Sequence, residues 1–220
     1  QAQVVEPPNI TCADTGMQLF SAGIRLRLIV DIVDVAVSSS EWIADLELTL
    51  TELELYIDIA SGLTTVNAAN GPNNQVNIEI QAGLARAFLG SIDESHFFDW
   101  TKDPIDSLTF GIIGQLQVTA PLVDQTLIVS AKGSGDAASI LNVQNGLTLP
   151  FEYTAGNSSA TISELINKLL ADTEIQITSD VPLSPLVATV LETVMDDLVA
   201  SVNTLLFPED AIIYNILSLV

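Results

Sequence analysis

The chain has 220 residues, 48% of them hydrophobic, which is enough to bury a core in one large or two small domains. Its 28 acidic and 6 basic residues give a formal charge of −22, which argues against nucleic acids and anionic membrane surfaces as partners. One cysteine, Cys12, excludes an internal disulfide framework, and one histidine, His96, offers no ligand set for zinc. There is no run of about twenty apolar residues and no signal segment, so we expect Gln1 to be a processed or truncated start.

The most regular pattern lies between Ile43 and Ala60. Apolar residues alternate with polar ones up to Leu50 and again, with the opposite parity, from Leu53. A period of two predicts one or two half-buried strands with a single apolar face. The change of parity at Thr51-Glu52 predicts a bulge or a corner. An amphipathic helix is the weaker alternative, because its apolar spacing would be three or four.

A second apolar stretch, Met17 to Val37, is predicted to pair with this strand through a connection at Ser38–Ser40. Arg25 and Arg27 lie on its polar face. We expect them to form cross-strand ion pairs with acidic residues of the neighbouring strand, namely Glu47, Glu52 or Glu54.

The next segments continue the β pattern. Gly62–Ala69 and Val76–Gln81 flank an Asn- and Gly-rich turn and predict a hairpin. Ala82–Ile92 fits a strand or a helix, and the glycines near its two ends favour a strand. Further strands are predicted at Leu108–Thr119 with a bulge near Gly111 and Gly114, at Thr126–Ala131 and at Leu147–Thr154. The Gly133–Asp136 segment between the last two is predicted to be a flexible turn.

The Asp93–Asp106 segment concentrates acidic and aromatic residues and is predicted to be a long solvated loop. A calcium site is the alternative, although the spacing of its carboxylates matches no EF-hand loop. The calcium candidates are Asp93, Glu94, Asp99, Asp103 and Asp106. Phe97 or Trp100 in the same loop could instead contact a carbohydrate.

The pattern changes to helical spacing at Ser159. Thr161–Glu164 has the form of a capping box, and the helix is predicted to end near Asp172. A short strand at Glu174–Thr178 and a second helix from Pro185 to Phe207 follow. The polar face of the second helix is acidic, which indicates a packing face rather than a membrane contact.

These elements predict an α+β fold, mainly an antiparallel, sandwich-like β-sheet followed by C-terminal helices. Residues 1–16 are expected to form an extended arm, because Pro7-Pro8 excludes a helix and a central strand. Residues 17–158 form the β-rich domain. Residues 159–220 form a helical region that packs on the sheet, so that the whole can be a single domain.

The last segment, Pro208–Val220, is too apolar to stay exposed. It either packs on its own sheet beside the second helix or docks in a neighbouring subunit as a donated strand or helix, with Gln1–Pro8 as the reciprocal contact. The candidate interface residues are Ile212, Ile213, Ile216, Leu217, Leu219 and Val220.

The order of segments resembles the distal part of the TadG-like proteins of the Tad (Flp) pilus system. The resemblance rests on VVEPP at Val4–Pro8, GIRLRLIV at Gly23–Val30, LELYIDIASGLTTVNAAN at Leu53–Asn70, VNIEIQAGLARAFLGSID at Val76–Asp93, and the Leu- and Val-rich C-terminal helix. The sequence departs from the family in lacking its N-terminal membrane anchor, a cysteine after the small-residue turn, and a clear final strand.

The resemblance implies a non-enzymatic structural or assembly component of a bacterial surface appendage, located outside the cell, at its surface or in the periplasm. It implies self-association or pilus and envelope proteins as partners, contact with the membrane only through the anchor, and neither a cofactor nor a small-molecule substrate. A single histidine without a serine or cysteine elbow also gives no nucleophilic catalytic set. The alternative function is an extracellular adhesin or carbohydrate-binding β-domain.

Overall fold

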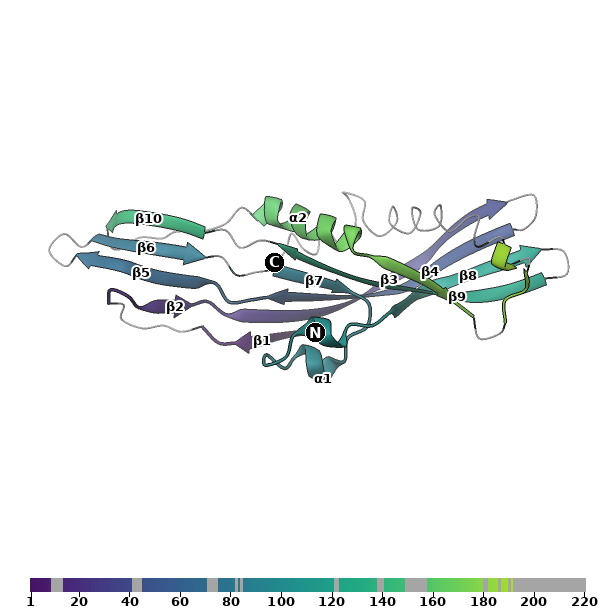
Figure 1. Ribbon diagram of the computed structural model, residues 1–220, viewed down its shortest axis with the longest axis horizontal. Coiled ribbons are helices and arrows are strands. Elements are labelled where there is room, and N and C mark those ends of the chain that lie inside the picture. The colour runs from purple at the N-terminus through teal and green to yellow at the C-terminus, as the bar shows by residue number, and fades with distance from the viewer. Residues whose placement is uncertain are drawn as a thin grey trace.

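The computed structural model describes residues 1–8, 14–40, 45–70, 75–81, 83, 85–120, 123–137, 141–148, 158–179, 182–185, 187–189 and 191. Over these residues the protein is elongated and built mainly from two antiparallel sheets, as Figure 1 shows. The predicted β-rich α+β fold is therefore confirmed.

The larger sheet has seven strands. They are β1 (Ala2–Glu6), β3 (Gly23–Ser40), β4 (Asp45–Ile59), β7 (Ala85–Leu89), β8 (Gly111–Ala120), β9 (Val123–Ala137) and β11 (Glu174–Thr178). Their order is β1-β3-β4-β7-β9-β11, and β8 also lies between β4 and β9. The arm thus contributes β1 at one edge of the sheet, and the region after α2 contributes β11 at the opposite edge.

The smaller sheet has four strands and extends the molecule along its long axis (Figure 1). It consists of β2 (Gln18–Phe20), β5 (Leu63–Asn70), β6 (Gln75–Gln81) and β10 (Leu141–Thr148), in the order β10-β6-β5-β2. The predicted hairpin is confirmed as β5 and β6. The chain passes from one sheet to the other where β4 leads into β5 and β6 leads back into β7. A Cβ on Gly83 would lie 1.9 Å from the Ala60 oxygen, so only glycine fits at this passage.

Strand β4 is the central strand of the larger sheet, as its alternation predicts. It pairs with β3 on one side, and on the other side with β8 through Asp45–Leu50 and with β7 through Leu55–Ile59. At the change of parity, Thr51 and Glu52 are both exposed. The register with β3 shifts there, since Asp31 pairs with Glu52 but Val35 pairs with Leu50. The predicted irregularity is confirmed, and its extra residues lie in β3.

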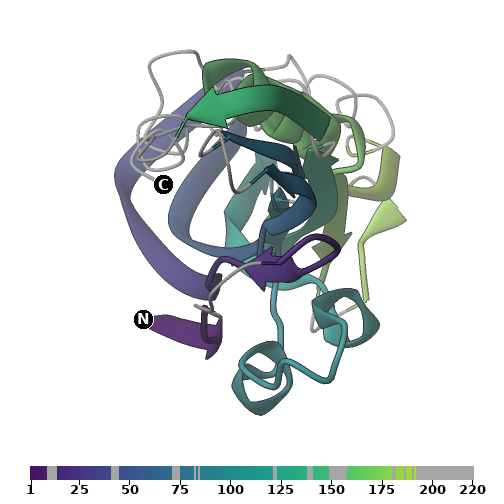
Figure 2. The ribbon, with the colours of Figure 1, turned by 90° about the vertical axis from the view of Figure 1, so that its left-hand side faces the viewer.

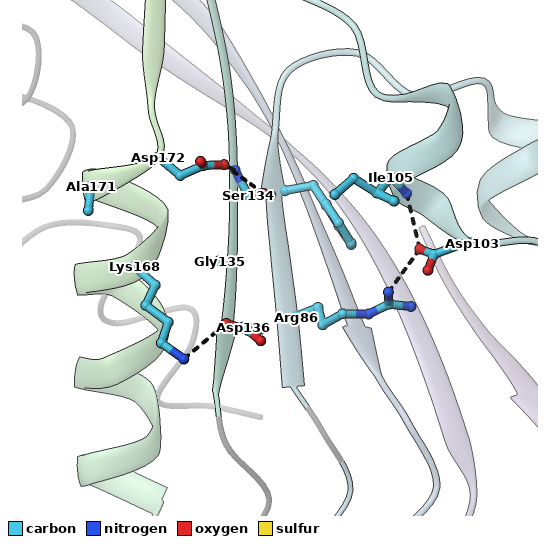
Figure 3. A pocket seen from close by; sticks show the side chains of 10 residues that line it. Arg86, Asp103, Ile105, Ser134, Gly135, Asp136, Lys168, Ala171 and Asp172 are labelled. Carbon is cyan, nitrogen blue, oxygen red and sulfur yellow. Dashed lines mark hydrogen bonds and ion pairs between the residues drawn. The ribbon is translucent and has the colours of Figure 1, made fainter.

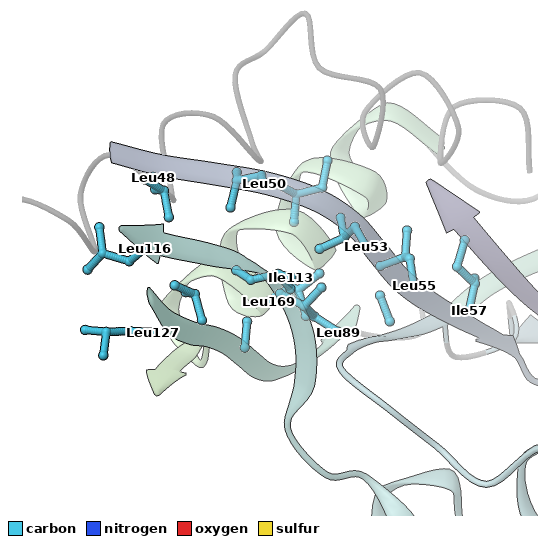
Figure 4. Packing of buried hydrophobic residues seen from close by; sticks show 14 of the residues in the cluster. Leu48, Leu50, Leu53, Leu55, Ile57, Leu89, Ile113, Leu116, Leu127 and Leu169 are labelled. Atoms are coloured by element: carbon cyan, nitrogen blue, oxygen red, sulfur yellow. The ribbon is translucent and has the colours of Figure 1, made fainter. Parts of the chain in front are cut away.

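The core fills one face of this sheet. Leu48, Leu50, Leu53, Leu55 and Ile57 of β4 pack with residues of β7, β8 and β9, as Figure 4 shows. Helix α2 (Ser158–Ala171) covers this face with the buried side chains of its apolar stripe, Leu165, Ile166 and Leu169. A Cβ on Gly135 of β9 would lie 2.6 Å from the Leu165 carbonyl, so the glycine permits the close approach of helix and strand.

Several expected boundaries were wrong. Met17–Val37 is split between β2 and β3, and Ser38–Ser40 belong to β3, where they pair with Glu47, Leu46 and Asp45. Gly133–Asp136 is part of β9 and pairs with β7, so it is not a turn. Thr161 lies inside α2, which begins at Ser158, so Thr161–Glu164 does not cap the helix. Leu147 and Thr148 belong to β10, while the rest of the predicted Leu147–Thr154 strand lies outside the described residues.

A further helical turn begins at Pro185. The Ser184 Oγ accepts a hydrogen bond from the Val187 amide at 3.2 Å, as an N-cap does, and Val187 is fully buried. Most of the predicted second helix and all of Pro208–Val220 lie outside the described residues. Among the residues described, no helix is long and apolar enough to span a membrane.

Candidate functional site

Strands β7 and β8 both lie between β4 and β9, one after the other along the sheet. A twenty-residue excursion, residues 91–110, connects them. The Gly90 amide donates to the Glu54 carbonyl at 3.2 Å, and a bridge between Ser91 and Thr109 closes the neck of the excursion. Its tip contains α1 (Glu94–Phe97) and the 3-10 helix η2 (Pro104–Ser107), and Figure 2 shows it projecting from the sheets. The predicted long loop therefore has helical turns and a defined base.

Arg25 is the main anchor of the excursion. This residue of β3 is 5% exposed, and its guanidinium donates to the carbonyls of Phe97, Asp99 and Lys102 at 2.6, 2.9 and 3.1 Å. Its Nε also bonds Asp58 Oδ1 of β4 at 3.2 Å. A planar guanidinium can satisfy several acceptors at once, so a single residue fixes three points of the loop on the sheet.

The other two arginines make further ion pairs around the excursion. Arg86 of β7 bridges Asp58 Oδ2 at 2.6 Å and Asp103 Oδ1 at 2.8 Å. Arg27 bonds Glu54 at 2.6 Å, which confirms one of the predicted cross-strand pairs. The expected partner of Arg25 was wrong, since it pairs with Asp58, and its side chain is buried because the excursion covers that face of the sheet.

An aromatic cluster fills the space beneath the excursion. Tyr56, Phe88 and Phe97 are at most 1% exposed, and the rings of Tyr56 and Phe97 meet edge to face with centroids 4.9 Å apart. The Tyr56 hydroxyl oxygen lies 3.0 Å from Glu54 Oε2 and 3.1 Å from the Ile92 carbonyl oxygen, either of which can accept its single proton. Burial raises the pKa of this hydroxyl. Because Phe97 is buried and Trp100 is 67% exposed, only Trp100 of the two predicted contact residues is available to a ligand.

A pocket of about 540 Å³ lies between the excursion and α2. Its floor is formed by Arg86 and Phe88 of β7 and by Ser134–Asp136 of β9. Asp103 and Ile105 form one wall, and Figure 3 shows the other wall, formed by Lys168 and Ala171 of α2 and by Asp172, which directly follows the helix. Four elements that are distant in the sequence thus build one concave surface.

Ion pairs and hydrogen bonds hold the charged groups of the pocket in place. Lys168 Nζ bonds Asp136 Oδ1 at 3.0 Å, and this bond raises the pKa of Lys168. Burial opposes the charge of Arg86, but its bond to Asp58 and the charges of Asp58 and Asp103 outweigh burial and raise its pKa. Both cations therefore remain charged at neutral pH.

Asp172 gives the end of α2 a polar contact with β9. Its Oδ2 accepts hydrogen bonds from the amide and the hydroxyl of Ser134, at 3.0 and 2.7 Å.

The pocket was not predicted from the sequence. Its one local signal is the Gly133-x-Gly135 pattern within an otherwise regular strand, which marks the close approach of another element.

Three of the five calcium candidates bind groups in their own surroundings. Asp93 accepts from Ser95 and from the His96 amide, Asp99 accepts from Thr101, and these hydrogen bonds lower the pKa of both carboxyls. Asp103 is bound to Arg86 and caps η2. The remaining two are Glu94 and Asp106, in the first turns of α1 and η2. Within the described residues, no three His, Cys, Asp or Glu side chains form a group that could hold a metal ion.

The other predicted site residues are placed as follows. His96 lies on α1, with its Nε2 2.9 Å from the Asp103 carbonyl. Cys12 and the candidate interface residues from Ile212 to Val220 lie outside the described residues.

No family model, curated protein or solved structure gives a significant match to the chain.

Proposed function

We propose that the chain is a non-enzymatic structural or assembly component of a bacterial surface appendage, of the TadG-like kind, and that copies associate through an open edge of the larger sheet. Two features support the proposal: the resemblance in segment order, and the uncovered length of β3. The second is the observation that carries it.

Strand β1 covers only the beginning of β3. Its pairing runs from Gly23 to Leu26, and Gln1 reaches Arg27, whereas β3 continues to Ser40. Among the described residues no strand lies against Leu28–Ser40 on that side. An uncovered strand edge is a template for pairing with a further strand.

The direction of the backbone groups along this edge follows from the contact at its start. The Arg27 amide donates to the Gln1 carbonyl at 2.8 Å, and the Arg27 carbonyl accepts from the Gln1 amino group at 2.8 Å. Backbone groups alternate along a strand, so Ile29 directs its N–H and C=O to the same outer side. The Ile29 side chain is 52% exposed, which adds apolar surface to the edge.

A proline at Ile29 tests the proposal. Ile29→Pro removes an outward-facing N–H, and proline is tolerated on an edge strand in that orientation, so the fold should persist. Leu28→Pro is the matched control, because the Leu28 amide faces β4 and its loss breaks the ladder. The measurement is sedimentation velocity over a concentration series at about 0.15 M salt, where charge repulsion is screened beyond roughly 8 Å.

We expect the wild-type protein to associate and Ile29→Pro to remain monomeric with its melting temperature nearly unchanged. A wild-type protein that is monomeric throughout, or an Ile29→Pro variant that associates as well as wild type, would contradict the proposal. Deleting Ala211–Val220 identifies the strand donor: a folded deletion variant that no longer associates assigns this role to the C-terminal segment.

A further inference from the structure

We propose that the pocket between η2 and α2 binds a saccharide, that is, a neutral ligand rich in hydroxyl groups. This inference is independent of the proposed assembly role. It rests on the shape of the pocket, the balance of its charges and the hydrogen-bonding groups that its side chains present.

The charges of the pocket favour a neutral ligand. Its lining includes two cations, Arg86 and Lys168, and three carboxylates, Asp103, Asp136 and Asp172. An anion would face an excess of carboxylates on a chain of formal charge −22. A cation would compete with Arg86 and Lys168, which already occupy Asp103 and Asp136 at 2.8 and 3.0 Å.

The bound groups still leave positions for hydroxyl groups. The hydrogen bonds described above engage one oxygen of each carboxylate: Oδ1 of Asp103, Oδ1 of Asp136 and Oδ2 of Asp172. The second oxygen of each makes none of these bonds. The guanidinium and ammonium groups also carry more N–H donors than these contacts use. A sugar hydroxyl both donates and accepts, so it can bind between such acceptors and donors.

An apolar surface accompanies the polar groups. Ile105, 49% exposed on the wall formed by the excursion, supplies this surface, while Phe88 is buried beneath the floor. Binding sites for small molecules combine such apolar surface with a few fixed polar groups. The excursion and α2 are held to the sheet by the Arg86–Asp103 and Ser134–Asp172 contacts, so the two walls are fixed in place before a ligand binds.

The test is saturation-transfer NMR on the full chain with three neutral probes, methyl β-glucoside, methyl β-galactoside and N-acetylglucosamine, and one amine, spermidine. Each is used at about 10 mM, because ligands of this size bind in the millimolar range. Ala171→Phe fills the pocket from α2 without removing a polar group. Asn167→Phe places the same side chain on an exposed position of α2 that does not line the pocket.

We expect transfer to at least one sugar in the wild type and in Asn167→Phe, and its loss in Ala171→Phe. If thermal melting shows that Ala171→Phe does not fold, Ile105→Ser at the rim replaces it, with at least a several-fold loss expected. Transfer to no sugar, transfer to spermidine alone, or transfer that survives Ala171→Phe would overturn the proposal. Transfer abolished by Trp100→Ala but kept by Ala171→Phe would place the sugar on the exposed tryptophan and would also overturn it.

Discussion

Replacing Arg25 by methionine should detach the excursion from the sheet. Methionine keeps much of the apolar volume of the side chain but provides no donor. The carbonyls of Phe97, Asp99 and Lys102 then lose their common partner, and Asp58, itself 5% exposed, keeps Arg86 as its one remaining ion-pair partner among the described residues.

The cost can be bounded from the contacts. Breaking a buried ion pair by removing one partner costs about 3–5 kcal/mol, and an unsatisfied buried carbonyl about 1–3 kcal/mol. Arg86 still compensates Asp58 at 2.6 Å, and the Asp99 and Lys102 carbonyls are only partly buried, so water can replace part of the loss. We therefore expect the free energy of unfolding to fall by about 3–4 kcal/mol in total. Local opening of the excursion would limit this loss, because water would then reach the freed groups.

Two measurements locate and size the effect. Hydrogen exchange followed by mass spectrometry should show faster exchange at the amides of residues 93–108, with β4 and β9 little changed. Urea unfolding gives the global loss. Lys168→Met is the matched control: it removes the same charge from a side chain that is 44% exposed, and such pairs contribute at most about 1 kcal/mol. A global loss below about 1 kcal/mol in Arg25→Met, with unchanged exchange in the excursion, would refute the reasoning.

Three further predictions concern packing, pH and salt. In Gly114→Ala the new Cβ would lie 2.2 Å from the Thr49 carbonyl oxygen, so urea unfolding should show that the free energy of unfolding falls by about 1–3 kcal/mol or more. Gly16→Ala is the control, with a positive φ but open space around the new Cβ, and it should lose only about 1 kcal/mol. Equal losses in the two variants would contradict the steric account. Because the folded pKa of Asp99 is lowered, chiefly by the Thr101 hydroxyl, Thr101→Ala should be less stable than wild type near neutral pH. That difference should disappear as the pH falls below the ordinary aspartate pKa of about 3.9 and through the folded one, and a difference that persists in acid would count against it. With a formal charge of −22, the melting temperature should rise from about 10 mM to about 150 mM salt, and a fall would mean that attractive pairs dominate.

The local pattern of the sequence was sufficient for most elements. The alternation along Asp45–Ile59 predicted the central strand and its change of parity, and helical spacing predicted α2. These predictions succeed because alternate burial on a strand, or burial at every third and fourth residue of a helix, is recorded directly in the order of apolar residues. The β5–β6 hairpin and β11 follow from the same reasoning.

Which polar residues become buried was decided only by the tertiary structure. Tyr56 and Asp58 occupy the polar face of an alternating strand, yet each is at most 5% exposed because the excursion covers them. Gly135 has the composition of a turn but lies in a strand, since a helix that begins more than twenty residues later packs against it. Arg25 binds carbonyls 72 to 77 residues away. Such contacts depend on how the sheets bring distant segments together, and the spacing of residues along the chain carries no trace of them.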